Sequence, residues 1–502
     1  MKKILILLLV TALGSCSISR GESIDAAPNL SLSLIESGLR QNLVQLKSSA
    51  FETFVTEKVY SFDGVNPSIF VQTLKNGDIL IYYRQPKDSP TRTFIVTLEV
   101  PGPITGKLWT HKYAFRSEYA GDPIKSSYDS KPLGEFAIMA EGPNMFDFGK
   151  GNRSVFVSRS GRFIEQPVGL IKRLADASVA TVSIFEERII LSFELSETGE
   201  EWEDGWLVAS REMLLDISNT RTMEALIVSD FGRVKILRHD GWWLTTQRGD
   251  YDGCEDNCYY PNPGFYTPRS LLRWFCQKEN RLFIDVVLSS MKSAVETTPD
   301  SGYTLMPIVP ELFQEWYGMG ADYLDTRFST DGARFLVLCA KIFGCKSARQ
   351  KAPLLAKSYE ILLTTHKNIA GKGYFLPDYI WGGPLKTKVH SSLNHILCVI
   401  NYLLELSELT NDGTYLSMTQ PMFDGLEALF PYWIKDNGDL WYAYFPDGNT
   451  FKRKDYPDLT YNDLKECSAL CERVFGQKNT IIEKYLKIKR DYLTKIGLLK
   501  GK

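Results

Sequence analysis

The chain has 502 residues, of which 24% are charged, and its formal net charge is −2 at pH 7. Such a balance gives no overall field that favours nucleic acid or another polyanion, so any attraction for an acidic ligand must be local. The length exceeds one core of ordinary size, and 44% hydrophobic content is typical of globular proteins, so at least two domains are expected. Tyrosine and tryptophan are abundant, as in many carbohydrate-facing clefts and also in many β-rich extracytoplasmic proteins.

The N-terminus has the pattern of a secretory signal. Two lysines precede an apolar run that is too short to span a membrane, and small residues follow. Leu13-Gly14-Ser15-Cys16 resembles the lipobox of bacterial lipoproteins, in which the cysteine is lipidated. The alternative is an ordinary signal peptide that happens to hold a cysteine. We expect a signal peptide at 1–15, a lipidated tether at 16–49 and an extracytoplasmic protein whose partner is a bacterial membrane, held through acyl chains on Cys16.

Residues 50–262 are expected to form a β-rich domain with a sandwich-like or barrel-like arrangement. The segment "SIFVQTLKNGDILIYYR" at 68–84 predicts two strands joined by a hairpin turn at Asn-Gly. No clean repeat period occurs, so a full propeller is not supported. Further strands are predicted at 154–166, 187–197 and 232–247.

Residues 263–502 change to helical periodicity. Apolar residues recur at a spacing near 3.6, and loops rich in glycine and aspartate separate the segments. Consecutive helix pairs with functional loops between them favour an (α/α) toroid, giving an α+β multidomain chain overall. Such toroids commonly process polysaccharides, although a fold alone does not fix a function. The helical segments are 270–295, 330–344, 351–368, 392–410, 422–435 and 461–476.

The sequence gives little sign of a metal or an organic cofactor. Cys254 and Cys258 lie in one loop and can pair in an oxidising compartment. Cys467 and Cys471 lie one helical turn apart and are interpreted as small core residues, because zinc would need further ligands nearby. A structural Ca²⁺ in the Asp-rich loop "GDYDGCEDN" is only weakly indicated, and the oligomeric state is left open.

Three C-terminal segments combine tyrosines with ionisable residues at the ends of predicted helices. The first, "GYFLPDYIWGGPLKTKVHSSLNHILCVINYLLEL" at 373–406, carries Asp378-Tyr379 and then Leu393-Asn394. The second, "ALFPYWIKDNGDLWYAY" at 428–444, carries Tyr442. The third, "FKRKDYPDLTYNDL", carries Arg453, Asp455, Tyr456, Asn462 and Leu464.

In their order and spacing these segments resemble the C-terminal domain of D-glucuronyl C5-epimerases, which invert uronic acids in heparosan-type glycans. A β-rich part before a helical part also agrees with that family. The resemblance implies that Asp378, Tyr379, Tyr442 and Tyr456 are catalytic and that the partner is an acidic polysaccharide. The chain departs from the family pattern in three places: Asp378 stands where glutamate is usual, no arginine lies near Phe445, and the segment after Tyr456 lacks histidines. The identity of the substrate therefore stays open.

Inversion at C5 needs a base on one face, an acid on the other, and donors or cations on the carboxylate. A phenol can donate the proton, and a partly buried carboxylate can act as the base. Arg453 is the expected carboxylate clamp, because a guanidinium binds a carboxylate with two hydrogen bonds. The other expected substrate-binding residues are Lys388, Asn394, Arg327, His390 and Tyr461.

Each of these residues also has a plain structural interpretation. The tyrosines can be packed rim residues, Asp378 can be a turn carboxylate, and the basic loops can be solvated. Asp322, Asp325, Arg327 and Asp331 lie together in "GMGADYLDTRFSTDGARF", where they can form a network that fixes the loop. His395 is expected to be a core histidine, whereas His390 is the candidate for proton transfer.

The leading hypothesis is a lipid-anchored enzyme that epimerises uronic acid residues at C5. A polysaccharide lyase is the nearest alternative, because it abstracts the same proton. An (α/α) glycoside hydrolase would need two facing carboxylates, for which Asp378 with Asp325 or Asp331 is the pair to inspect. A glycan-binding surface lipoprotein without catalytic activity is the remaining alternative.

Overall fold

The computed structural model describes residues 280–499, apart from residue 449, and shorter stretches between residues 30 and 274. These residues form two compact units. Unit 1 consists of Met1–Arg162 and Ala175–Asp216, and unit 2 consists of Phe163–Leu174 and Ile217–Lys502. The lipobox, Cys254 and the proposed Ca²⁺ loop lie outside the described residues. No helix in the described part of the chain combines the length and the apolar character needed to cross a bilayer.

Unit 1 is built from antiparallel strands. Its strands are β1 (Leu30–Glu36), β2 (Leu39–Gln41), β3 (Val44–Phe51), β4 (Val55–Ser61), β5 (Pro67–Leu74), β6 (Ile79–Gln85), β7 (Arg92–Glu99), β8 (Lys107–Lys112), β9 (Ser127–Pro132), β10 (Phe136–Ile138), β11 (Asn144–Asp147), β12 (Ser154–Val157), β15 (Ala180–Phe185), β16 (Arg188–Leu195) and β17 (Trp202–Ser210). One sheet has the order β10-β15-β16-β7-β1-β2. The other sheet pairs β9-β8-β11-β12-β17-β6-β5-β4-β3.

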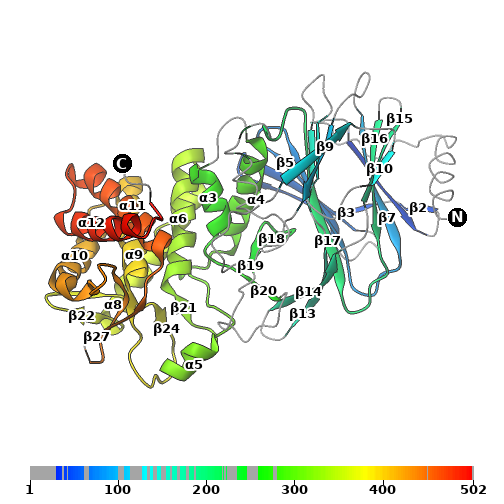
Figure 1. Ribbon diagram of the computed structural model, residues 1–502. Helices are drawn as coiled ribbons and strands as arrows, with labels where there is room; N and C mark the ends of the chain where they lie inside the picture. Colours follow the sequence, from blue (N-terminus) through cyan, green and yellow to red (C-terminus); the bar gives the residue numbers. More distant parts are fainter. Residues whose placement is uncertain are drawn as a thin grey trace. The chain divides into compact units, whose positions relative to one another are not determined.

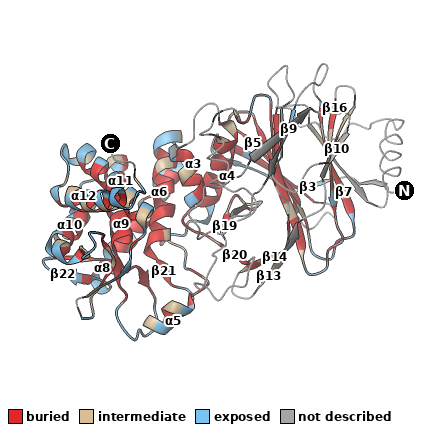
Figure 2. Ribbon diagram, viewed as in Figure 1, coloured by how far each residue is buried: buried red, intermediate tan, exposed pale blue. Residues whose placement is uncertain are grey.

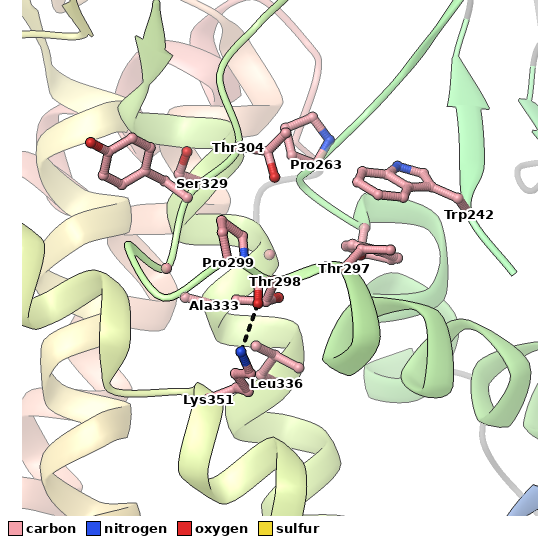
Figure 3. Close-up of a pocket in the computed structure, with 14 residues that line it drawn as sticks. Trp242, Pro263, Thr297, Thr298, Pro299, Thr304, Ser329, Ala333, Leu336 and Lys351 are labelled. Carbon is pink, nitrogen blue, oxygen red and sulfur yellow. Dashed lines mark hydrogen bonds between the residues drawn. The ribbon is translucent and has the colours of Figure 1, made fainter. Parts of the chain in front are cut away.

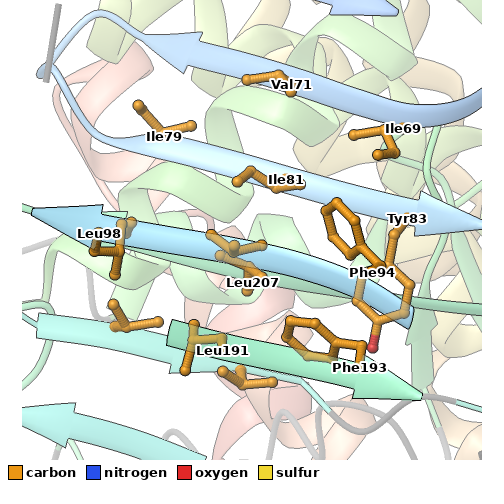
Figure 4. Packing of buried hydrophobic residues seen from close by; sticks show 14 of the residues in the cluster. Ile69, Val71, Ile79, Ile81, Tyr83, Phe94, Leu98, Leu191, Phe193 and Leu207 are labelled. Atoms are coloured by element: carbon orange, nitrogen blue, oxygen red, sulfur yellow. The ribbon is translucent and has the colours of Figure 1, made fainter. Parts of the chain in front are cut away.

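The core of unit 1 lies between these two sheets. Alternate side chains of each strand point inward, so Ile69 and Ile81 of one sheet meet Phe94 and Leu191 of the other (Figure 4). The unit is therefore a β-sandwich. The predicted hairpin of β5 and β6 is confirmed, and its turn contains Gly77 at φ +84°.

The predicted tether is too long at its C-terminal end. Residues 16–49 were assigned to it, but β1 begins at Leu30 and pairs along its length with β7. Leu32 packs against the core of the sandwich. The apolar alternation in "LSLSLIE" is therefore that of a half-buried strand.

Unit 2 carries the helices. They are α3 (Tyr266–Trp274), α4 (Arg281–Thr297), α5 (Glu311–Tyr317), α6 (Thr326–Phe343), α7 (Lys346–Lys351), α8 (Leu354–Thr365), α9 (Leu393–Thr410), α10 (Thr414–Trp433), α11 (Pro457–Phe475) and α12 (Thr480–Lys495). Its strands are β18 (Lys235–Leu237), β19 (Trp243–Thr245), β20 (Cys258–Pro261), β21 (Leu324–Asp325), β22 (Asn368–Ala370), β23 (Gly373–Phe375), β24 (Tyr379–Ile380), β25 (Ser391–Ser392), β26 (Trp441–Phe445) and β27 (Thr450–Lys454). Strands β13 (Gly161–Glu165) and β14 (Ile171–Asp176) lie where the chain passes between the units.

The helices of unit 2 are arranged in consecutive pairs. Helices α3, α6, α9 and α11 pack on one another in this order, and each contacts a helix that follows it: α4, α7, α10 and α12 (Figure 1). Helix α9 is buried along almost its whole length (Figure 2). The α+β layout agrees with the sequence, whereas the closed (α/α) toroid stays a prediction.

A buried cluster of charges lies among α3, α6, α9 and α11. Arg334, which is fully buried, donates from Nε and Nη2 to the Glu405 carboxylate at 2.9 and 2.8 Å and also contacts Glu466. Arg327 pairs with Asp331 at 3.0 Å and with Asp463. The cluster is completed by Arg269, which reaches Asp331, and by Arg273, which reaches Glu466. Each of the helices α3, α6, α9 and α11 therefore contributes at least one charged side chain, which a side chain from another of these four helices neutralises.

Replacing Arg334 should strongly destabilise unit 2. In Arg334→Met the carboxylate of Glu405 stays buried without its guanidinium partner, a situation that costs about 3–5 kcal/mol. We expect a lower urea midpoint for the transition of the helical unit. The double variant Arg334→Met/Glu405→Leu should recover part of this loss, because it removes the orphaned charge as well. Equal instability of the single and double variants would contradict this account.

Candidate active site

A cavity of about 180 Å³ in unit 2 brings together residues from the loops at the ends of the helices. Tyr379, Tyr442 and Tyr456, predicted to be catalytic, all line it. So do two residues predicted to bind substrate, Arg327 and Asn394. The remaining lining residues are Met306, Ile308, Pro310, Phe313, Tyr323, Asp325, Phe328, His395 and Leu459.

A second cavity, of about 20 Å³, lies elsewhere in unit 2 (Figure 3). Trp242, Pro263 and Thr298 are among its lining residues, and Lys351 donates to the Thr298 carbonyl at 2.9 Å. Its volume suits about one water molecule. None of the predicted site residues lines it.

Short strands and one helix start position the three tyrosines. Tyr379 lies on β24, directly opposite Asp325 of β21. Tyr442 lies on β26, and its ring meets that of Tyr456 edge-on at a centroid distance of 5.6 Å. Tyr456 is the N-cap residue of α11 and is 45% exposed. Pro457 occupies the first turn of α11, as its fixed φ and missing N–H predict.

Asp378 does not line the cavity, contrary to the sequence prediction. Its side chain is completely buried, and its Oδ1 accepts the Ser392 N–H at 2.7 Å. Its Oδ2 lies 3.1 Å from His390 Nε2 and 3.6 Å from His395 Nε2. Burial by itself would raise the pKa of Asp378, but the attraction of His395 and His390 holds that pKa below its usual value of 3.8. Asp378 is thus a buried anion that holds two imidazole rings.

Both histidines are buried, as predicted for His395, and of the two it is His395 rather than His390 that lines the cavity. His390, the candidate for proton transfer, is buried outside the cavity, where its Nδ1 bonds to the Tyr317 hydroxyl and its ring stacks on Phe445. His395, the expected core histidine, lines the cavity from the first turn of α9, and its Nδ1 lies 2.9 Å from Thr326 Oγ1. Tyr317, His390, Asp378, His395 and Thr326 therefore form one continuous polar chain beneath the cavity.

Burial shifts the titration of the lining groups. It raises the pKa of Asp325 from 3.8 to about 7; the backbone N–H of Phe328 opposes this shift and the charge of Asp378 adds to it. Burial also raises the pKa of Tyr379 well above 10.0, so this phenol keeps its proton. The pKa of His395 falls to about 4, again mainly through burial, so its ring is neutral at pH 7. Shifted groups gathered in a cavity are a recognised mark of functional sites.

Arg327 and Asn394 both line the cavity, but they differ in whether their side-chain polar atoms already have partners within the protein. The guanidinium of Arg327 is occupied by Asp331, Asp463 and the Asn394 carbonyl, so it fixes the cavity wall. The side-chain oxygen of Asn394 is buried and has no hydrogen-bond partner in the described structure. An orphaned buried acceptor is costly in a folded protein, and a donor on a ligand would satisfy it.

The other predicted binding residues lie outside the cavity lining. Arg453 is exposed on β27 in a left-handed conformation, φ +76°, and its guanidinium lies 3.2 Å from the centroid of the Trp316 ring. The backbone N–H of Lys388 bonds to Asp447, while its side chain is exposed. Tyr461 is half-buried on α11. Of these residues, Arg453 is the one held in a defined orientation.

Asp455 and Asp325 each have a structural role that the family motif does not indicate. Asp455 matches the family pattern, yet it is buried, and its carboxylate pairs with the fully buried Lys489 at 2.6 Å. It therefore joins α12 to the start of α11. Asp325, for which the sequence suggests either a hydrolase pair or a network that fixes the loop, caps α6 by accepting the Phe328 N–H at 2.8 Å. An aspartate before an apolar periodic run was the signal that could have assigned this cap.

Among the described residues, no group of three or more His, Cys, Asp or Glu is placed to hold a metal ion. Cys467 and Cys471 are both buried in α11, as predicted for small core residues.

No protein-family model and no curated protein sequence matches the chain. Among solved structures, it is similar to cellobiose 2-epimerase from Bacillus thermoamylovorans B4167, with 12% identity over 47% of this chain and 62% of that one, at a TM-score of 0.35. It is also similar to a D-mannose isomerase, with 14% identity over 46% and 57% of the two chains and a TM-score of 0.33. A family 76 glycoside hydrolase from a bovine Bacteroides thetaiotaomicron strain shows 10% identity over 83% and 75%, with a TM-score of 0.36.

The chain thus spans less than two thirds of the epimerase and of the isomerase. At these scores the likenesses carry no argument about the fold, substrate or reaction of this chain. The resemblance to the C5-epimerases likewise stays a prediction.

Asp325→Asn should change how stability depends on pH. Asparagine caps a helix as well as aspartate does, so α6 should keep its start. Because the pKa of Asp325 is raised on folding, the wild type loses stability as pH rises from about 4 to about 7. The variant lacks this loss and should be more stable above pH 7 by on the order of a few kcal/mol. Urea titrations at pH 4 and pH 8 test this, and a difference that does not grow with pH would contradict it.

Proposed function

We propose that this protein is an enzyme that modifies an acidic polysaccharide by proton transfer at C5 of a uronic acid residue, most simply as a C5-epimerase. The observation that supports it best is the cavity in which Tyr379, Tyr442 and Tyr456 meet a carboxylic acid, Asp325, whose pKa is raised to about 7. The C–H bond next to a carboxylate is only weakly acidic. Its cleavage needs a base whose pKa lies near neutral pH, which Asp325 provides, and an acid on the opposite face, for which the tyrosines offer phenol protons.

The size and lining of the cavity suit one sugar ring. Its volume, about 180 Å³, is below the roughly 300–1,000 Å³ of typical ligand pockets, so it would take a single residue of a chain. Phe313 and Tyr323 offer aromatic faces on which the apolar side of a pyranose can pack. Asn394 offers its unpaired oxygen to a sugar hydroxyl.

Arg453 supports the acidic character of the substrate. Its guanidinium lies 3.2 Å from the centroid of the Trp316 ring, so part of the side-chain entropy that binding would cost is already lost. No salt bridge to Arg453 is found among the described residues. Lys452 lies over Phe445, 5.6 Å from the ring centroid, and gives a second cation on the same strand. A uronate carboxylate is the anion that this strand would receive.

The geometry is less suited to glycoside hydrolysis. That reaction uses two carboxyl groups that flank the scissile bond. Asp378 is enclosed by histidines, and Asp331 is neutralised by Arg269 and Arg327. Asp325 is the one carboxylate among the described residues that line the cavity. A lyase would use the same first step and remains the second candidate for that reason.

The location of the enzyme is part of the proposal. The signal-like N-terminus and the lipobox at Cys16 support an extracytoplasmic lipoprotein, anchored to a bacterial membrane and acting on glycans outside the cytoplasm. Loss of palmitate labelling in Cys16→Ser would support this assignment, and unchanged labelling would exclude it.

Solvent-exchange experiments test the proposed reaction. Incubation of heparosan or another polyuronate with the enzyme in D₂O should introduce deuterium at C5 without chain cleavage, as followed by NMR. Tyr442→Phe and Tyr456→Phe should each slow the exchange about 100-fold or more, because a phenol that donates the proton is removed.

The matched control is Tyr432→Phe, which removes a hydroxyl from an exposed tyrosine of α10 that does not line the cavity. This variant should exchange at the wild-type rate. Unsaturated, cleaved products would instead identify a lyase. Wild-type exchange in both cavity variants would exclude the tyrosines as proton donors.

A further inference from the structure

We propose that Asp325, rather than Asp378, is the carboxylate that exchanges a proton with the substrate at C5. This assignment rests on the proposed function of the cavity. The sequence motif indicates Asp378 for this role. Asp325 lies 53 positions earlier in the chain, at the end of β21.

Strand pairing places Asp325 beside Tyr379, one of the three cavity tyrosines. Asp325 and Tyr379 are direct partners in the antiparallel pair of β21 and β24. Direct partners project to the same face of a sheet, with Cβ atoms about 4.5–5.5 Å apart. Both side chains line the cavity. The carboxyl group and the phenol therefore face the same volume from adjacent strands.

Asp378 projects away from this volume. It lies at a bend of the chain, immediately before Tyr379 and the start of β24. Its carboxylate accepts the Ser392 N–H and faces the rings of His390 and His395. Its exposure is 0%, so substrate cannot reach it without rearrangement of α9. Asp378 is a positioning residue that holds His395 against the cavity.

The local environment lets Asp325 both accept and return a proton. Burial and the nearby charges of Asp378 and Asp331 favour its protonated form, whereas the backbone N–H groups of Phe328 and Arg327 favour the carboxylate. These opposing effects place its pKa at about 7. A catalytic base works best when its pKa lies near the working pH.

The proposed step balances as follows. The carboxylate of Asp325 takes the C5 proton, so the C5–H bond breaks, an O–H bond forms on Asp325, and the electron pair stays on the substrate as an enolate-like anion. A phenol on the opposite face of the ring, from Tyr442 or Tyr456, gives its proton to C5, and the tyrosine is left as phenolate. Solvent then takes the proton from Asp325 and returns one to the tyrosine. No oxidant, reductant or metal is consumed.

Asp325→Asn and Asp325→Ser test the assignment. Both replacements can cap α6 but cannot take up a proton. Exchange of C5 hydrogen for deuterium in heparosan and polygalacturonate should fall about 100-fold or more in each variant. Calorimetric titration with heparosan oligosaccharides should show unchanged affinity, and circular dichroism should show retained helix.

Asp436→Asn is the matched control, because Asp436 is exposed in a turn and does not line the cavity. It should exchange at the wild-type rate. Wild-type exchange in a folded Asp325 variant overturns this assignment and leaves the proposed function standing. Loss of oligosaccharide binding in the Asp325 variants also overturns it, because a proton-transfer role does not require that loss. Absence of exchange in the wild type on both polymers overturns the proposed function itself, and the assignment with it.

Discussion

The helical unit depends on one constraint: three arginines and three carboxylates are buried among α3, α6, α9 and α11 and must be neutralised there. A buried charge without a partner is strongly destabilising, so this cluster admits few relative placements of α3, α6, α9 and α11. Arg327 links this charge cluster to the cavity, because it binds Asp463 of α11 and the Asn394 carbonyl of α9. The starts of α6 and α9, which present Asp325 and His395, are thereby held together.

Sequence patterns were sufficient wherever a feature is local. The helical period located α9 and α11, and Pro457 marked the start of α11 correctly. The three tyrosines lie in the segments between helices: Tyr379 on β24, Tyr442 on β26 and Tyr456 at the start of α11. The family resemblance, rather than a local pattern, predicts that they share a site, and all three line one cavity.

Partners far apart in the chain could not be predicted. Arg327 and Asp463 are separated by 136 positions, and nothing in either segment identifies the other. The sequence allows two interpretations of Arg327, a substrate-binding residue or part of a network that fixes the loop, and the structure shows its charge neutralised by Asp331 and Asp463. Asp455 and Lys489 are a second example. The family motif includes the aspartate, but it does not indicate the buried lysine with which this aspartate forms an ion pair. Pairing within a core is a property of the packed structure.

The prediction for Asp378 is wrong because a sequence motif specifies the order of residues but not the direction in which each side chain points. Asp378 lies at a bend just before β24, and its carboxylate faces the Ser392 N–H and two histidine rings. In this chain the tyrosine faces the cavity and the aspartate is enclosed by His390 and His395. Two carboxyl groups thus have opposite environments: the pKa of Asp378 is lowered by the histidines, and that of Asp325 is raised by burial. Only a group that changes its proton state near neutral pH can serve as a base and then as an acid. The difference between the two pKa values therefore favours Asp325 as the group that transfers the proton and Asp378 as a residue that positions the histidines.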